Sequence, residues 1–133
     1  MRLVIGGYAQ GKLDFVLRSL DGRDYDVWDG ELPGEGESKE DGKLGGRLII
    51  VNHFHRWVRI RLTDGGRPEE EILDFLERCG DCVIICDEIG NGIVPEDRFE
   101  RECRERTGRI LIELAARAER VERVICGIGQ QIK

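Results

Sequence analysis

The residues best suited to chemistry stand near the start of the chain, in the segment Gly6–Lys12. Its spacing, G-x-x-x-x-G-K, is that of a phosphate-binding loop, and the apolar segment Arg2–Ile5 before it predicts a short strand. Glycines allow a tight turn that points backbone N–H groups into one concavity, and the next helix adds its positive end. The pattern therefore predicts phosphate binding. The alternative is a glycine-rich strand-to-helix turn with an incidental lysine.

The residue after the loop lysine is Leu13, where such loops usually carry Ser or Thr. The usual hydroxyl binds Mg²⁺, and a leucine side chain has no oxygen to offer. Lys12 would reach the outer phosphate oxygens as a point charge. The sequence thus predicts a loop that binds phosphate, with a role for Mg²⁺ in doubt and no metal ligand assigned. The predicted phosphate contacts are Gly6, Gly7, Tyr8, Ala9, Gln10, Gly11, Lys12 and Leu13.

Polar residues follow two further predicted strands. Asn52 follows the apolar run Leu48–Val51, and Asp87 and Glu88 follow the run Cys82–Cys86. Such runs are typical of strands covered on both faces. In a parallel sheet the carboxyl ends of the strands meet at one edge, so these side chains are expected to converge on the loop. A carboxylate there can orient a substrate hydroxyl or a metal-bound water, which makes Glu88 a catalytic candidate beside Lys12; the alternative is that it caps the following loop.

The remaining pattern supplies the elements that hold these residues. Strands alternate with helices, which predicts an α/β fold with a parallel sheet and helices on both faces. Helices are expected over Lys12–Leu20, His53–Leu62, Pro68–Cys79 and from Pro95 to about Glu119, and further strands over Tyr25–Trp28 and Val121–Cys126. Gly127–Gly129 is expected to turn the chain into a short tail.

Length and composition limit the function classes. A chain of 133 residues predicts a single domain, 1–133, and the segment 30–46, which has few apolar residues, predicts a mobile surface loop. The net charge of −6 argues against nucleic acid or an anionic membrane as partner. With no apolar run long enough to cross a bilayer and no room for a signal peptide, a cytoplasmic location is expected. Five cysteines, including the C-x-x-C segment Cys79–Cys82, favour free thiols over a redox pair or a zinc site.

The motifs resemble those of the bifunctional adenosylcobinamide kinase / adenosylcobinamide-phosphate guanylyltransferase family of cobalamin biosynthesis. The segment from Asp87 to Arg98 resembles the family's N-E-V-G-x-G-I-V-P motif, Thr107–Arg109 its A-G-R, and Gly127–Lys133 its C-terminal G-x-x-x-x-I-K. Gly6–Lys12 resembles its G-G-x-x-S-G-K loop. The resemblance implies a RecA-like P-loop NTPase fold, a homo-oligomer (a trimer), GTP or ATP as cofactor, and a cobinamide-type substrate. It also implies transfer of GMP through a guanylated histidine.

Several residues depart from the family pattern. Leu13 replaces the metal-binding hydroxyl, and Asn52 stands where the family has a metal-associated acid. Leu111 stands where the family usually has Asn. The segment that carries the family's guanylated histidine is missing between Trp28 and Leu48, so guanylyl transfer is not expected.

The chain has two histidines, His53 and His55, and both lie after the third predicted strand. At positions i and i+2 of a helix they would not share a face, which argues against a metal pair. They are expected at a solvent or subunit boundary; the alternatives are a replacement guanylyl acceptor and a phosphate contact. The basic residues Arg56, Arg59 and Arg61 are expected on a solvated face, the alternative being an anion contact.

Two functions fit these observations. The first is a shortened, divergent enzyme of the family that binds a purine nucleotide and retains a kinase activity. The second is a pseudoenzyme that senses nucleotide or assembles with other subunits without turnover. Lys12 and Glu88 favour the enzyme, whereas Leu13 and Asn52 favour the binding module.

Overall fold

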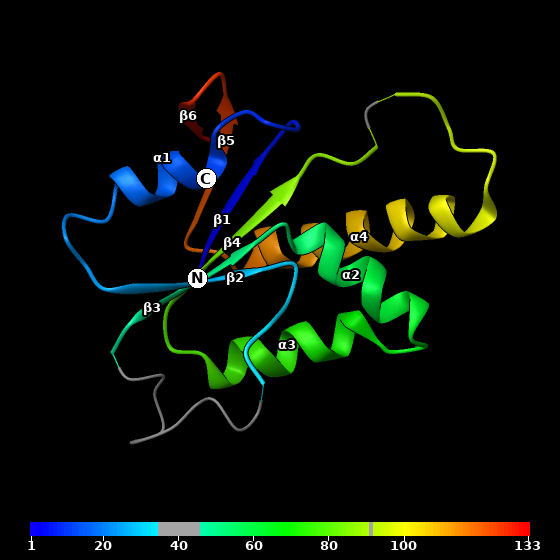
Figure 1. Ribbon diagram of the computed structural model, residues 1–133, viewed down its shortest axis with the longest axis horizontal. Helices are drawn as coiled ribbons and strands as arrows, with labels where there is room; N and C mark the ends of the chain where they lie inside the picture. Colours follow the sequence, from blue (N-terminus) through cyan, green and yellow to red (C-terminus); the bar gives the residue numbers. More distant parts are fainter. Residues whose placement is uncertain (35–45, 91) are drawn as a thin grey trace.

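Six strands form one sheet in the computed structural model, which describes residues 1–34, 46–90 and 92–133. The strands are β1 (Arg2–Gly6), β2 (Tyr25–Asp29), β3 (Leu48–Asn52), β4 (Cys82–Asp87), β5 (Arg120–Ile125) and β6 (Ile128–Gln131). Their order across the sheet is β2-β3-β4-β1-β5-β6 (Figure 1). All neighbouring strands are parallel except β5 and β6, which are antiparallel. The carboxyl ends of β1, β3 and β4 therefore lie at one edge, as expected.

Every residue of β3 and β4 is buried, which explains why both read as continuous apolar runs. β2 is an edge strand, and four of its five residues are exposed. The middle strands of the sheet are thus buried, and the loop Gly6–Lys12 follows β1, directly beside β4.

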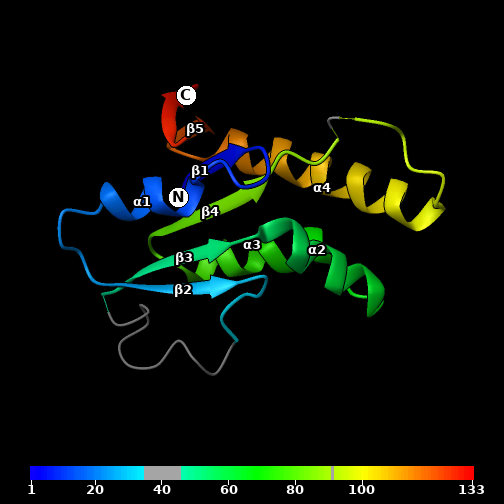
Figure 2. The same cartoon turned by 45° about the horizontal axis from the view of Figure 1, so that its top comes forward.

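Helices cover both faces of the sheet (Figure 2). The helices are α1 (Lys12–Arg18), α2 (Phe54–Thr63), α3 (Pro68–Arg78) and α4 (Arg98–Arg117). Val16 of α1 packs with Val4 and Ile50 on one face. The core on the other face contains Phe54 of α2, Ile72 of α3 and Leu114 of α4. The prediction of an α/β sheet with helices on both faces is confirmed.

Two elements differ from the sequence prediction. α4 begins at Arg98 rather than at Pro95, because the Asp97 side chain accepts a hydrogen bond from the Glu100 N–H (3.0 Å) and caps the helix there. The expected tail after Gly127 is instead the strand β6, which pairs with β5 from Ile125↔Ile128 to Glu122↔Gln131.

Other expectations fall partly outside the described chain. Residues 35–45 of the predicted mobile loop 30–46 are not among the described residues, and the single-domain expectation stays a prediction. Among the described residues, no helix combines the length and apolarity that a membrane crossing requires. All five cysteines are free, and only Cys126 is exposed.

Candidate functional site

The loop Gly6–Lys12 joins β1 to α1 in a conformation that depends on its small residues. Gly11, the N-cap of α1, has a φ of 80°, and Ala9 has a φ of 52°, both in the left-handed region. A Cβ on Gly6 would lie 2.5 Å from the Val124 carbonyl oxygen of β5. Close strand packing therefore requires a residue without a side chain at the start of this loop.

Gln10 anchors the loop to the turn between β5 and β6. Its Oε1 accepts a hydrogen bond from the Cys126 N–H (2.7 Å), and its carbonyl accepts one from the Gly127 N–H (2.8 Å). Cys126 has a φ of 51°, so the turn is strained where it meets the loop. The C-terminal hairpin thus helps to fix the loop Gly6–Lys12.

Lys12 places its ammonium between the loop and β4. Its Nζ donates to the Gly7 carbonyl oxygen (2.6 Å) and lies 2.7 Å from Oδ1 of Asp87. Only 7% of the Lys12 side chain and 11% of the Asp87 side chain are exposed, so this is a buried ion pair at the carboxyl edge of the sheet. A phosphate that approached the loop would meet a cation held in a fixed position.

A cavity of about 230 Å³ opens beside this pair. It is lined by Ala9, Gln10, Gly11, Lys12, Leu13, Asp14, Asn52, His53 and Asp87. The predicted convergence of Lys12, Asn52 and Asp87 is therefore found, although the roles assigned to them stay predictions. Gly6, Gly7 and Tyr8 do not line the cavity, and the Tyr8 side chain is exposed.

Asp29 joins the site at the carboxyl end of β2. Its Oδ1 accepts from Asn52 Nδ2 (2.9 Å) and lies 2.5 Å from His53 Nδ1. Sequence reasoning missed Asp29. A signal was present, since Asp29 directly follows a predicted strand, but the pairing of β2 with β3 was needed to place it opposite Asn52.

His55 lies on the other side of the site, against Asp87. Its Nδ1 accepts a hydrogen bond from the Asp87 N–H (3.4 Å), and its Nε2 lies 3.6 Å from Asp87 Oδ2. Burial lowers the pKa of His55, and the Asp87 carboxylate opposes that shift. The His53 and His55 rings lie 5.8 Å apart in an edge-to-face arrangement. His53 thus lines the cavity and His55 contacts Asp87 beside it. The expected solvent or subunit boundary and its alternatives, a guanylyl acceptor and a phosphate contact, stay predictions.

Glu88 is placed differently from Asp87. Its two carboxylate oxygens accept from Arg123 Nε and Nη2 of β5, at 2.7 Å and 3.0 Å, and it does not line the cavity. The carboxylate that faces Lys12 is that of Asp87. The predicted catalytic role of Glu88 stays a prediction. The position beside Lys12 that such a role requires is occupied by the Asp87 carboxylate.

The donors around the cavity do not form an evident magnesium site. Leu13 supplies no oxygen, the Asn52 amide donates to Asp29, and Asp87 is paired with Lys12. Within residues 1–34, 46–90 and 92–133, no cluster of three or more His, Cys, Asp or Glu is arranged to hold a metal ion.

The arginines of α2 connect helices. Arg61 Nε donates to Glu71 of α3 (2.7 Å), and Arg59 pairs with Glu100 of α4 and lies over the Phe99 ring. Arg61 lowers the pKa of Glu71 through this hydrogen bond. These two residues of the predicted solvated face thus make inter-helix ion pairs.

The cysteines contribute packing. Burial raises the pKa of the Cys86 thiol to about 12, and the pKa of the Cys82 thiol is also raised, chiefly by its hydrogen bond with Cys79 and then by burial. Neither thiol is a ready nucleophile at neutral pH.

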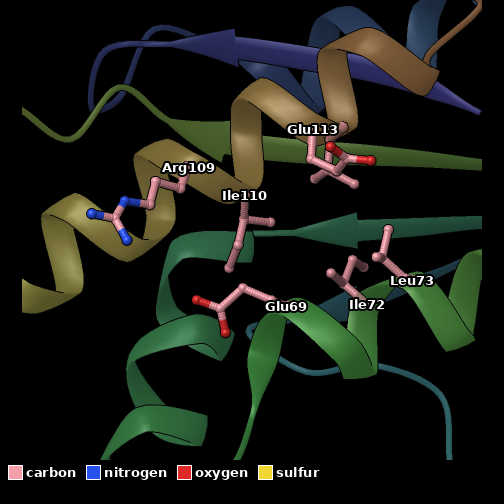
Figure 3. A pocket seen from close by; sticks show the side chains of 7 residues that line it. Glu69, Ile72, Leu73, Arg109, Ile110 and Glu113 are labelled. Carbon is pink, nitrogen blue, oxygen red and sulfur yellow. The ribbon is translucent and has the colours of Figure 1, made fainter.

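A second cavity, of about 260 Å³, lies between α3 and α4 (Figure 3). Its lining includes the apolar side chains Ile72, Leu73, Ile110 and Leu114 and the charged side chains Glu69, Arg109 and Glu113. Glu69 pairs with Arg106, which lowers its pKa. None of the loop residues lines this cavity, so the two cavities are separate sites.

Comparisons with known proteins agree with this architecture. A family model described as cobinamide kinase / cobinamide phosphate guanyltransferase matches residues 39–132. The match contains Asn52, Asp87 and Glu88, but it does not extend to Gly6–Lys12. The role of the loop therefore depends on its own spacing and geometry.

Two curated relatives are also similar. The bifunctional adenosylcobalamin biosynthesis protein CobU of Salmonella typhimurium (strain LT2) is 41% identical over 69 residues, which are 49% of this chain and 38% of that protein. The protein of the same name from Escherichia coli (strain K12) is 42% identical over 67 residues, 47% of this chain and 37% of its own length. The match thus spans less than two fifths of either relative.

Proposed function

Because this chain belongs to the cobinamide kinase / cobinamide phosphate guanyltransferase family, we propose that it binds a purine nucleoside triphosphate, GTP or ATP, at the loop Gly6–Lys12. The observation that carries the proposal is the position of Lys12. Its ammonium is buried between Asp87 and the Gly7 carbonyl oxygen, at the cavity that Ala9, Gln10 and Gly11 of the loop also line. Backbone donors together with one fixed cation are what a triphosphate requires.

We further propose that the phosphoryl acceptor is a hydroxyl of a cobinamide-type molecule. This proposal comes from the family and from the names of the two relatives, which describe cobalamin biosynthesis. The polar side chains of Asn52, His53 and Asp87 line the cavity beyond the loop and offer hydrogen-bonding groups to such an acceptor. A homo-oligomer is proposed on the same family grounds.

Guanylyl transfer is not part of the proposed activity. The family's guanylated histidine falls in a segment that this sequence lacks, and the whole chain contains only His53 and His55. Both ring nitrogens of His55 face Asp87, so His55 has no free lone pair for attack on an α-phosphate, and His53 is the histidine for which the mass measurement must exclude an adduct. Intact-mass spectrometry after incubation with GTP and Mg²⁺ is expected to show no added GMP.

A second candidate function is a binding module without turnover. The observation in its favour concerns Leu13 and Asn52, which line the cavity. By the resemblance, they stand where the family has a metal-binding hydroxyl and a metal-associated acid. Phosphoryl transfer usually depends on Mg²⁺ to balance developing charge. Binding of GTP without any GDP release in the presence of adenosylcobinamide would favour this candidate.

Calorimetric titration with GTP, ATP and GMP, each with and without Mg²⁺, tests the proposal. The parent is expected to bind a triphosphate more tightly than GMP. Lys12→Ala is expected to weaken triphosphate binding by more than about tenfold, because it removes the cation that meets the outer phosphates.

Lys133→Ala is the matched control. The Lys133 ammonium donates to the Ala115 and Ala116 carbonyl oxygens at the end of α4, away from the cavity. This variant is expected to keep the parent affinity. Equal affinity of Lys12→Ala and parent would contradict the phosphate-binding proposal.

A further inference from the structure

His53 occupies an unusual backbone position at the edge of the cavity. It is the N-cap of α2, with a φ of 50° and a ψ of 47°, in the left-handed region that residues other than glycine seldom adopt. Its side chain lines the cavity and is 27% exposed. Backbone strain of this kind is concentrated at functional sites, so the position of the His53 ring in the cavity points to a functional role.

The contact with Asp29 determines where the His53 ring carries its proton. Oδ1 of Asp29 lies 2.5 Å from Nδ1 of His53, and a carboxylate can only accept a hydrogen bond. The hydrogen is therefore assigned to Nδ1, which leaves the lone pair of the neutral ring on Nε2. Nε2 has no hydrogen-bond partner among the described residues. Asn52 Nδ2 donates to the same Oδ1 (2.9 Å) and also lies 3.1 Å from His53 Nδ1, so the shorter contact with the carboxylate decides the placement of the hydrogen.

His55 does not offer the same group. Its Nδ1 accepts from the Asp87 N–H, and its Nε2 faces Asp87 Oδ2. The two histidines thus have different environments although they are neighbours in the sequence. Of the two histidines, only His53 lines the cavity beside Lys12. It has a carboxylate against Nδ1 and a lone pair on Nε2.

We infer that His53 is the proton acceptor for phosphoryl transfer at this site and that Asp29 is the residue that positions it, an inference that rests on the proposed function. The acceptor oxygen forms a bond to the γ-phosphorus while the bond from phosphorus to the β,γ-bridging oxygen breaks. The nucleoside diphosphate leaves with that electron pair. The acceptor hydroxyl proton moves to Nε2 of His53 and then to water, while Asp29 stabilises the imidazolium.

Two ionisable groups lie against this ring: the Asp29 carboxylate at Nδ1 and the His55 ring, whose centroid is 5.8 Å away. Lys12 and Asp87 line the same cavity. The ring must be neutral to accept a proton, so the rate is expected to fall at acidic pH.

The test begins with calorimetric titration of GTP into parent, His53→Gln and Asp29→Asn. GDP release is then measured with adenosylcobinamide as the acceptor probe, as a function of pH. His53→Gln is expected to lower kcat by about a hundredfold or more and to remove the acidic limb of the profile, with a GTP Kd within about threefold of the parent. Asp29→Asn is expected to lower kcat but to retain an acidic limb, because the His53 base is still present.

Asp26→Asn is the matched control. Asp26 lies on the same strand as Asp29 but pairs with Arg47 (2.9 Å and 3.0 Å), outside the cavity. This variant is expected to retain the parent kcat and pH profile.

Three results would overturn the inference. The first is a His53→Gln protein with the parent kcat and acidic limb. The second is a GMP adduct that His53→Gln abolishes, since His53 would then be a nucleophile. The third is a parent that binds GTP but releases no GDP; this result would contradict the role of His53 but not the proposed nucleotide binding. A parent that binds no triphosphate contradicts the proposed function itself.

Discussion

Lys12 and Asp87 form a buried ion pair across the carboxyl edge of the sheet, with Nζ 2.7 Å from Oδ1. The two residues come from neighbouring strands, because Lys12 follows β1 and Asp87 ends β4. Removing one partner of a buried pair leaves the other charge without compensation. The same contact is therefore expected to affect stability and, under the proposed function, nucleotide binding.

Asp87→Ala is expected to lower the free energy of unfolding by about 3 kcal/mol, because it leaves the Lys12 ammonium buried beside a single carbonyl acceptor. Urea denaturation followed by circular dichroism measures this change. The control is Asp81→Ala, which removes an exposed pair with Arg23 (2.6 Å) and is expected to cost less than about 1 kcal/mol. Equal losses in the two variants would contradict the account of the buried pair.

Magnesium is expected to change the nucleotide affinity of the parent little, because Leu13 offers no oxygen and the Asn52 amide offers no charge. The double variant Leu13→Ser, Asn52→Asp is expected to create a clear dependence on Mg²⁺. Calorimetry with and without Mg²⁺ measures both proteins. Strong Mg²⁺ dependence in the parent would show that another carboxylate at the site, Asp29 or Asp87, already holds the ion.

His55 is expected to make stability depend on pH. Burial lowers the pKa of its folded-state imidazole below the usual 6.5, so the unfolded chain binds a proton there more readily than the folded chain. The stabilising contribution is complete above the unfolded pKa. It is lost as the pH falls below about 6.5, toward the lower folded pKa.

Urea unfolding across this pH range compares the parent with His55→Gln. The variant is expected to show a shallower loss of stability in acid, because the other titrating groups are common to both proteins. Parallel pH curves for the two proteins would contradict the assignment to His55.

The candidate site could be predicted from the sequence to the extent that its residues directly follow buried strands. The spacing of Gly6–Lys12 and the apolar runs before Asn52 and Asp87 placed all three at one sheet edge, and the structure agrees. Asp29 could not be placed in this way, because β2 is the exposed edge strand and its partner follows the segment 30–46. Only the parallel register of β2 and β3 brings Asp29 opposite Asn52.

The sequence pattern also could not predict which of two neighbouring side chains faces the site. Asp87 and Glu88 are adjacent in the sequence, and nothing in the spacing says which one faces Lys12. In the structure Arg123 binds Glu88, so Asp87 is left to face the cavity. The strand β6 was missed because its residues, Ile128–Gln131, carry little apolar pattern; pairing with β5 supplies its order.

Gly129→Ala is expected to destabilise the C-terminal hairpin. A Cβ at Gly129 would lie 2.1 Å from Cζ of Phe15, whose ring packs over β6 and under Arg2. The ring must shift, and overpacking of this kind costs about 1–3 kcal/mol. Thermal denaturation measures the loss. Gly80→Ala is the control, since a Cβ there meets nothing within 4 Å, and it is expected to change stability little.

Thr107→Val is expected to stabilise the protein. Thr107 is fully buried on α4, and in the described part of the chain its hydroxyl is the buried side-chain group that finds no hydrogen-bond partner. Valine has nearly the same shape and removes the desolvated hydroxyl, so the free energy of unfolding is expected to rise by about 1 kcal/mol. Thr63→Val is the matched control on α2, because the Thr63 hydroxyl donates to the Arg59 carbonyl (2.9 Å), and this change is expected to be neutral or destabilising. Urea denaturation of both variants decides the point: a loss of stability in Thr107→Val would show that its hydroxyl has a partner, such as a buried water, that stabilises the fold.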